Sequence, residues 1–239
     1  MARYLFLLVP VSLALSGCAS VADHQMIGDR EQVLLAQMRK ACGGDAWDRV
    51  EGWHETGKVE LPNGLEATYD AWSAMRDLAT AARASAGEMQ LRHVGFDGTE
   101  FWSVGQDGSV SIDRRDETLR KQRRDAYISS HAYFLPDRFP ADFQVVGEKE
   151  HEGFSFVVLQ VTPTGAGSVD LWIDPASFLV RRMVADQESV ELSDYAFFHG
   201  VCTATTGLQR GKEAADTLTL KIETVSIEAQ SSEIFIAPE

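Results

Sequence analysis

The sequence predicts a mainly β domain with some α-structure, built on a curled antiparallel sheet. Many short segments rich in β-branched and aromatic residues predict strands, and two segments, 29–42 and 116–135, have helical patterning. Tight-turn signals such as Asp97-Gly98 and Asp107-Gly108 separate the strands. Because parallel strands need crossover connections of a dozen or more residues, these short connections predict antiparallel neighbours.

Residues 1–17 are typical of the export signal of a bacterial lipoprotein. The apolar run from Tyr4 to Leu15 is roughly 18 Å long as a helix, too short for a hydrocarbon core of about 30 Å. Leu15-Ser16-Gly17-Cys18 resembles a lipobox, which implies cleavage before Cys18 and diacylglycerol on its sulfur. Ala19 favours the outer membrane of a Gram-negative bacterium, with the protein facing the periplasm. The alternative is an ordinary signal peptide in which Cys18 occurs by chance.

The remaining 222 residues divide into a small and polar stretch at 18–28, expected to be a lipidated tether, and a single domain at 29–239. This mature chain has 21 basic and 36 acidic residues, a net charge of −15. A protein of this charge repels nucleic acid and anionic lipid at long range. Nucleic acid is therefore excluded as a partner.

The N-terminal helix is expected to begin at Asp29, a favourable N-cap, with Gln32 completing a capping box. Its apolar residues share one side at helical spacing, and they are Leu34, Leu35, Met38, Ala41 and Cys42. Gly43-Gly44 can then end the helix in a left-handed cap. From Val50 the pattern changes to about six short strands, with the first turn at Pro62-Asn63-Gly64.

Residues 116–135 interrupt the strands with apolar residues three and four apart, which predicts a second helix ended by Pro136. Strands resume after Asp142. Several of them, including 154–163 and 178–184, have apolar residues on both faces, whereas a half-buried sheet alternates more strictly. Either a sheet curled around a helix accounts for this pattern, or its concave side is an apolar pocket that the protein fills only in part.

The sequence indicates no catalytic or metal centre. Asp170 and Asp174 would lie on one strand face roughly 13 Å apart, whereas paired carboxylates of glycosidases lie about 5 to 9.5 Å apart. The pair Asp174-Pro175 is instead typical of a hairpin turn. Serine-hydrolase and zinc-protease motifs are absent, and the six histidines are scattered singly. We therefore expect no enzyme, no metal and no other cofactor.

Two further features each have two interpretations. Cys42 and Cys202 can form a disulfide in an oxidising compartment, or they can be two separate buried thiols. A basic cluster comprises Arg114, Arg115, Arg120, Lys121, Arg123 and Arg124. This cluster is either a solvated helix face compensated by neighbouring acids, or a contact for lipid headgroups or an acidic partner. The candidates for that contact are Arg120, Lys121, Arg123 and Arg124.

Several motifs follow one another along nearly all of the mature chain. They are Gly43-Gly44-x-Ala46-Trp47, Trp72 in a central strand, Phe96-Asp97-Gly98-x-x-x-Trp102, Leu171-Trp172-Ile173-Asp174, Leu192-Ser193-Asp194-Tyr195 and Gly200-Val201. Their order resembles the LolA/LolB-like superfamily of lipoprotein carriers. The resemblance implies an incomplete, half-open β-barrel of about eleven antiparallel strands around an apolar cavity. It also implies that the N-terminal helix and the helical insertion close this barrel.

The resemblance also implies a function: a non-enzymatic protein whose cavity binds or carries acyl chains of a lipid or lipoprotein. Trp72, Trp102, Leu171 and Ile173 are the candidate lining residues, with 116–135 as the lid. Leu65 is the candidate for the exposed leucine that LolB-type acceptors carry on an insertion loop, although its loop is short. The alternative is a periplasmic sensor or accessory protein that binds a protein partner.

Overall fold

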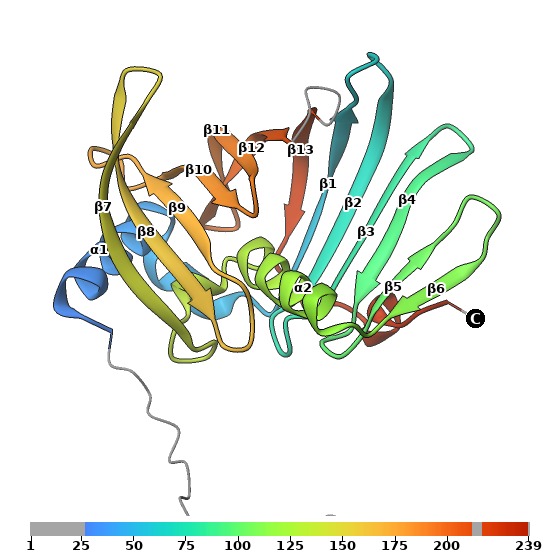
Figure 1. Cartoon of the computed structure of the whole chain (residues 1–239), viewed down its shortest axis with the longest axis horizontal. Helices are drawn as coiled ribbons and strands as arrows, with labels where there is room; N and C mark the ends of the chain where they lie inside the picture. Colours follow the sequence, from blue (N-terminus) through green and yellow to red (C-terminus); the bar gives the residue numbers. More distant parts are fainter. Residues whose placement is uncertain (1–26, 212–216, 239) are drawn as a thin grey trace, which may run out of the picture.

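The computed structural model describes residues 27–211 and 217–238, and these residues form one sheet of thirteen strands. Neighbouring strands are antiparallel, in the order β6-β5-β4-β3-β2-β1-β13-β12-β11-β10-β9-β8-β7. The described part of the sheet is open, with β6 and β7 at its two edges (Figure 1). The predicted open antiparallel fold is confirmed, with thirteen strands rather than about eleven. The signal peptide, Cys18 and most of the tether lie outside the described residues.

The sheet consists of two meanders and a strand that joins them. The first meander is β1 (Gly52–Glu60), β2 (Glu66–Ala74), β3 (Thr80–Ala86), β4 (Met89–Phe96), β5 (Phe101–Val104) and β6 (Val110–Asp113). The second is β7 (Ala141–His151), β8 (Phe154–Pro163), β9 (Val169–Ile173), β10 (Val180–Ala185), β11 (Glu188–Phe198) and β12 (Val201–Arg210). The last strand, β13 (Leu218–Ser226), pairs with β1 on one side and with β12 on the other.

Helix α1 (Asp29–Ala41) packs on the second meander with the apolar side that its residue spacing predicts. Its buried side chains are Leu34, Leu35 and Met38. The N-cap is Gly28 rather than Asp29, and the side chain of Gln32 donates to a backbone carbonyl before the helix, so the predicted capping box does not form. At the other end, Gly43 has the left-handed conformation that the sequence predicts, with a φ of 115°.

Helix α2 (Asp116–Ser129) lies in the hollow of the sheet, in front of its central strands (Figure 1). The helix is shorter than the predicted 116–135 because His131 takes a left-handed conformation, with a φ of 52°. The chain continues as a 3-10 turn, η2 (Ala132–Phe134), whose three side chains are buried. Among the described helices, none is long and apolar enough to cross a membrane.

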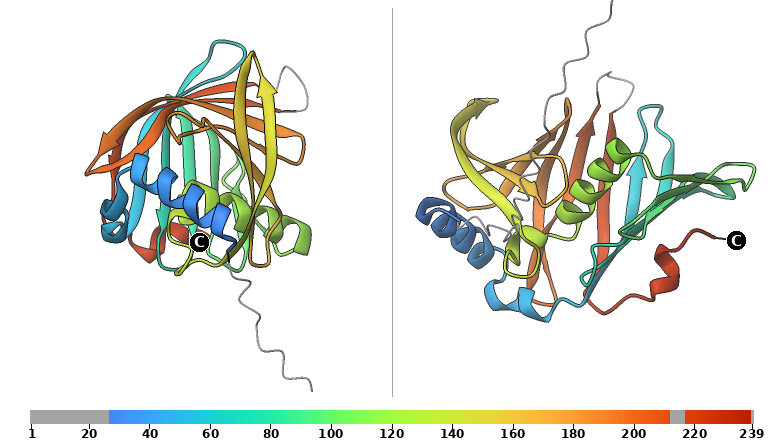
Figure 2. Two further views of the ribbon diagram at one scale, coloured as in Figure 1. Left: turned by 90° about the vertical axis from the view of Figure 1, so that its left-hand side faces the viewer. Right: turned by 60° about the horizontal axis from the view of Figure 1, so that its bottom comes forward.

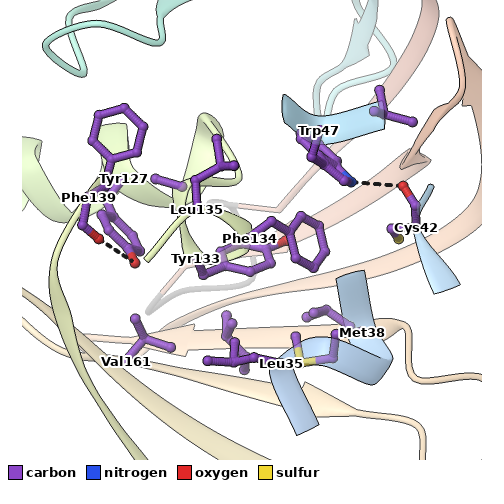
Figure 3. Close-up of a cluster of buried hydrophobic side chains, with 14 of the residues drawn as sticks. Leu35, Met38, Cys42, Trp47, Tyr127, Tyr133, Phe134, Leu135, Phe139 and Val161 are labelled. Atoms are coloured by element: carbon purple, nitrogen blue, oxygen red, sulfur yellow. Dashed lines mark hydrogen bonds between the residues drawn. The ribbon is translucent and has the colours of Figure 1, made fainter. Parts of the chain in front are cut away.

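The largest apolar cluster lies where α1 and η2 meet β8, β9 and neighbouring strands (Figure 3). Met38, Trp47 and Leu171 have a relative exposure of 0% in this cluster. Burial of a side chain such as Leu171 stabilises the fold by about 1.5 to 3 kcal/mol. The indole Nε1 of Trp47 donates a 2.8 Å hydrogen bond to the carbonyl of Cys42, so its one polar atom is satisfied inside the core (Figure 3).

Cys42, at the end of α1, and Cys202, in β12, form a disulfide with their Cα atoms 4.7 Å apart. Both residues are buried, and the backbone N–H of Cys202 donates to the carbonyl of Cys42 at 3.0 Å. Of the two interpretations of these cysteines, the structure has the bridge. It ties the N-terminal helix to a strand that comes 160 residues later.

The C-terminal segment packs on the outer face of the first meander, on the side away from α2 (Figure 2). It contains a short 3-10 turn, η4 (Ser232–Phe235). The ring of Phe235 is buried against Ala79, Ala81 and Trp102. This part of the sheet is therefore covered on its convex side, as well as facing α2 on its concave side.

Candidate functional site: a cavity on the concave face

A cavity of about 550 Å³ lies between α2 and the concave face of the sheet. Strands β1 to β5 contribute one wall, and β9 to β12 contribute the other. The apolar residues that line it include Trp53, Ala71, Ala82, Val94, Phe101, Ile128, Met183 and Val190. Its volume is in the range of small-molecule sites, which is about 300 to 1,000 Å³.

At one level of the wall the inward positions of β2 and β3 are both alanines, Ala71 and Ala82, which leaves room for this cavity. Glu55 of β1 is in register with Ala71 of β2, Ala71 with Ala82 of β3, and Ala82 with Val94 of β4. All four residues line the cavity. Because adjacent strands lie about 4.8 Å apart, this row spans roughly 14 Å of the wall. The methyl groups of two alanines do not fill the space between the sheet and α2.

The cavity wall also contains a carboxyl group, that of Glu55. Trp53 donates to its Oε2 from Nε1 at 2.9 Å, and the hydroxyl of Tyr69 donates to its Oε1 at 3.2 Å. Burial raises the pKa of Glu55, against the opposing effect of these two hydrogen bonds and of the charge of His54. Burial, followed by the nearby charge of Glu55, raises the pKa of Tyr69 well above its ordinary value. Glu55 and Tyr69 therefore form a polar place in the wall of β1 and β2, beside the apolar Trp53 and Ala71.

Helix α2 contributes charged groups that are already paired. The side chain of Arg124 is only 5% exposed. Its guanidinium forms ion pairs with Asp125, at 2.9 Å, and with Asp186. Lys121 lies 3.4 Å from the carboxylate of Glu188. Asp186 follows β10 and Glu188 begins β11, so these contacts hold the helix against the far wall of the cavity.

Comparison with solved structures shows that other proteins share this fold. A LolA superfamily protein from Nitrosomonas europaea aligns at a TM-score of 0.52 and 12% identity, covering 82% of this chain and 97% of that one. A putative outer membrane lipoprotein-sorting protein domain from Vibrio parahaemolyticus aligns at 0.55 and 9% identity, covering 86% and 96%. This chain has the LolA/LolB-like fold.

A DUF1329 family protein from Desulfovibrio piger is similar to the same extent, at a TM-score of 0.55 and 11% identity, covering 87% of this chain and 98% of that one. No protein-family model matches the sequence, and no curated protein matches it. At these identities the likeness to the solved LolA/LolB-like structures concerns the fold alone.

Of the four predicted lining residues, only Trp72 borders the cavity, and its ring does not face into it. The ring lies on the face of β2 opposite Ala71, where it stacks on His54 with centroids 4.8 Å apart and packs in the cluster that contains Trp102. Leu171 is on the same face as its partner Met183, which lines the cavity, but it is fully buried in the main core. Ile173 is fully buried there as well.

Trp102 differs most clearly from its predicted position, because its side chain lies on the convex face of the sheet. Its ring covers Gly95, the residue opposite it on β4, and a Cβ at Gly95 would lie 2.2 Å from that ring. The indole Nε1 donates to the carbonyl of Phe235. The residue is therefore part of the contact with the C-terminal segment and takes no part in the cavity.

Leu65 does not have the position expected of an insertion loop. The chain turns tightly between β1 and β2, where the N–H of Leu61 donates to the carbonyl of Leu65 at 2.9 Å. Leu65 is half-buried, whereas Phe154, at the start of β8, is 68% exposed. In the described part of this LolA/LolB-like fold, Leu65 is thus neither on a long loop nor fully exposed.

The four basic residues of α2 that were predicted to form one contact lie in different surroundings. Arg120 is exposed, whereas Lys121 and Arg124 line the main cavity and pair with acids. Arg123 borders a second cavity of about 200 Å³, beside Tyr127. The four residues therefore do not form one basic surface, because a helix turns each neighbour by about 100°.

Asp170 and Asp174 have structural partners. Asp174 accepts hydrogen bonds from Ala176 N–H at 2.9 Å and from the Ser177 hydroxyl at 2.6 Å, so it closes the predicted turn. Asp170 accepts from Gln160 at 3.2 Å.

One group of possible metal ligands occurs among the described residues. It comprises His151, Glu152 and Glu191, with candidate ligand atoms within 4.8 Å of one another. The guanidinium of Arg182 lies 3.0 Å from the ring of His151, where it competes with any cation. Ion pairing alone accounts for this group.

Sequence reasoning missed Glu55 and Tyr69. The available signal was the alternation in β1, where Glu55 shares a face with Trp53 and is followed by Gly57. A carboxyl group on the same strand face as a buried tryptophan is in an unfavourable position unless it has a partner.

Proposed function

We propose that this protein binds or carries a hydrophobic ligand, an acyl chain of a lipid or lipoprotein, in the cavity between α2 and the sheet. The cavity of about 550 Å³, with its row of small and apolar residues, is the observation that carries this proposal. Each CH₂ group that moves from water into such a wall contributes about 0.8 kcal/mol. No chemical step is needed for this function.

The resemblance of the fold to a LolA superfamily protein and to a putative outer membrane lipoprotein-sorting protein domain supports the same function. In the proposed arrangement, the mature chain is attached to the outer membrane through lipid on Cys18 and faces the periplasm. Metabolic labelling with an alkyne fatty acid tests the anchor. We expect label in the wild-type protein and none in Cys18→Ala, whereas equal label in both would refute lipidation at this residue.

Ligand binding can be tested with the mature chain in which Cys18 is replaced by Ala, after removal of co-purified lipid. We expect it to bind a fluorescent fatty-acyl probe. Ala82→Phe should weaken binding by about tenfold or more, since its ring displaces at least two CH₂ groups of the chain. Arg83→Phe is the matched control, because Arg83 is exposed on the opposite face of the same strand. Absence of binding to the unsubstituted chain would refute the proposal.

A protein partner is the second candidate function. Two phenylalanines are unusually exposed, Phe154 at 68% and Phe197 at 65%. Exposed aromatic residues of this kind are enriched where proteins bind one another. Cross-linking in intact cells distinguishes the two functions. The second function requires a defined adduct that is lost in Phe154→Ser or Phe197→Ser while acyl-probe binding is unchanged.

A further inference from the structure

The carboxyl group of Glu55 has unused hydrogen-bonding capacity inside the cavity. A carboxylate has about four acceptor positions on its two oxygens. On each oxygen of Glu55 one of these positions accepts a hydrogen bond, from Trp53 Nε1 on one and from the Tyr69 hydroxyl on the other. Neither donor is positively charged. Among the described residues, no lysine or arginine forms an ion pair with Glu55.

Three basic residues line the cavity: Lys121 and Arg124 of α2, which pair with acids, and Arg92 of β4, which is exposed and forms no ion pair with Glu55. Arg124 pairs with Asp125 and Asp186, and Lys121 lies beside Glu188. Glu55 is only partly exposed, and a half-buried carboxylate without a paired cation is costly, whereas a glutamine would make neutral hydrogen bonds at lower cost. The carboxyl group of Glu55 is therefore suited to a positive charge placed directly against it, which no lysine or arginine of the described residues provides.

The neighbouring positions of the row have the opposite character. From Glu55 the register leads to Ala71, then Ala82, then Val94, all on the cavity wall. One end of the row is thus an acceptor of hydrogen bonds, and the three positions in register with it on the next strands are apolar. This is the complement of a molecule with a donating polar end and a hydrocarbon tail.

From this arrangement, and resting on the proposed function, we propose that the ligand is a cationic amphiphile, with a primary ammonium group on Glu55 and its hydrocarbon chain along Ala71, Ala82 and Val94. The raised pKa of Glu55 supports this proposal, since an ammonium ion would offset the cost of the buried charge. Binding then selects the polar end of the ligand as well as its chain.

Three single-chain probes of equal length test the selectivity, all below their micelle concentrations: dodecylammonium, dodecanol and dodecanoate. The protein is the delipidated mature chain with Cys18→Ala, and calorimetry gives the affinities. We expect dodecylammonium to bind about tenfold more tightly than dodecanol, with dodecanoate weakest, because charge-assisted hydrogen bonds are the stronger ones.

Glu55→Gln keeps the shape of the side chain and removes its charge. It should abolish the preference for dodecylammonium over dodecanol and leave the affinity for dodecanol unchanged. Glu60→Gln is the matched control, because Glu60 is an exposed residue at the end of the same strand, and it should retain the preference. Circular dichroism of each variant checks that the fold is intact.

The outcomes separate this inference from the function on which it rests. If all three probes bind equally, or if Glu55→Gln keeps the preference for the amine, the ammonium site is refuted and the acyl-binding function stands. A preference for dodecanoate refutes the site as well. If no probe binds, the acyl-binding function fails, and the ammonium site fails with it.

The same ammonium chemistry can come from a diacylated lipopeptide with a free amino terminus or from an ethanolamine headgroup. Each is tested against its own N-acetylated form. Tighter binding of either free amine supports the ammonium site and identifies the source. Equal binding of the free and acetylated forms in both pairs refutes the site.

Discussion

The indole of Trp102 and the backbone carbonyl of Phe235 are joined by a 2.7 Å hydrogen bond across 133 residues of sequence. The bond fixes the C-terminal segment on the convex face of β3 to β5. Trp102 and Phe235 are both almost fully buried by this contact, at 1% and 3% exposure. The outer face of the first meander thus has a small core of its own.

Phe235→Ala should therefore destabilise the protein. We expect a loss of about 3 to 5 kcal/mol in the free energy of unfolding, measured by urea denaturation, because the substitution leaves a cavity beside Trp102. The neighbouring Ile236 is 58% exposed, so Ile236→Ala should change stability by no more than about 0.5 kcal/mol. Equal effects of the two substitutions would contradict this packing.

His131 should make the protein sensitive to acid. It is packed against Trp47 and Trp53, with ring centroids 5.1 and 5.0 Å away, and burial lowers its pKa to about 4 from an ordinary 6.5. The unfolded chain thus binds this proton more readily than the folded one. Stability should therefore fall by about 3 kcal/mol as the pH drops from 6.5 to 4.

Denaturant unfolding at several pH values tests this sensitivity. His131→Asn should lower stability overall but flatten its dependence on pH in this window. His199→Asn is the matched control, because His199 also has a left-handed backbone, with a φ of 52°, and is exposed. An unchanged slope in His131→Asn would assign the acid sensitivity to other groups.

Glu55 should have the opposite effect on the pH dependence of stability. Its pKa is raised in the folded protein, so the folded state holds the proton more tightly than the unfolded chain. The resulting stabilisation is present at low pH and is lost as the pH rises above about 4.5, the ordinary pKa of the side chain. Glu55→Gln should thus be more stable than the wild type at pH 7 and similar to it at pH 4, as measured by thermal unfolding. A loss of stability at pH 7 would mean that the carboxylate is structural.

Removal of the disulfide should destabilise the protein without changing its fold. For Cys42→Ala combined with Cys202→Ala, we expect a loss of about 2 to 5 kcal/mol, since the bridge closes a long loop of the unfolded chain. Thermal unfolding of the double variant, compared with the oxidised and reduced wild type, measures this. The oxidised wild type should have the highest Tm, and identical Tm values in all three would show that the bridge does not form.

Local sequence patterns predicted many turns, strands and helix faces, because residues close together in the sequence determine these features. The Asp-Gly turns have positive φ at Gly98 and Gly108, Asp174 closes its turn, and α1 presents its apolar side as expected. The end of α2 was missed because the apolar spacing continues through η2. The change comes at His131, whose ring packs against Trp47 and Trp53, and neither residue is near it in the sequence.

The candidate site was harder to predict, because alternation along a strand shows which residues share a face but not which face is concave. Trp102 and Phe101 are adjacent, yet Phe101 lines the cavity and Trp102 lies under the C-terminal segment. That segment is the reason, and its contact with β5 is not visible in local patterning. Glu55 was missed because its role depends on Tyr69, a residue of the next strand.

The position of β13 has a consequence for how the molecule assembles. Both meanders consist of neighbours in sequence, so each can pair soon after its residues are available. The seam between them, β1 beside β13 beside β12, needs residues from both ends of the domain. A chain that lacks its last two dozen residues would have two half-sheets with unpaired edges at β1 and β12, which other strands can join. The sheet is therefore complete only after β13 has been made, and the two walls of the cavity come together at that step.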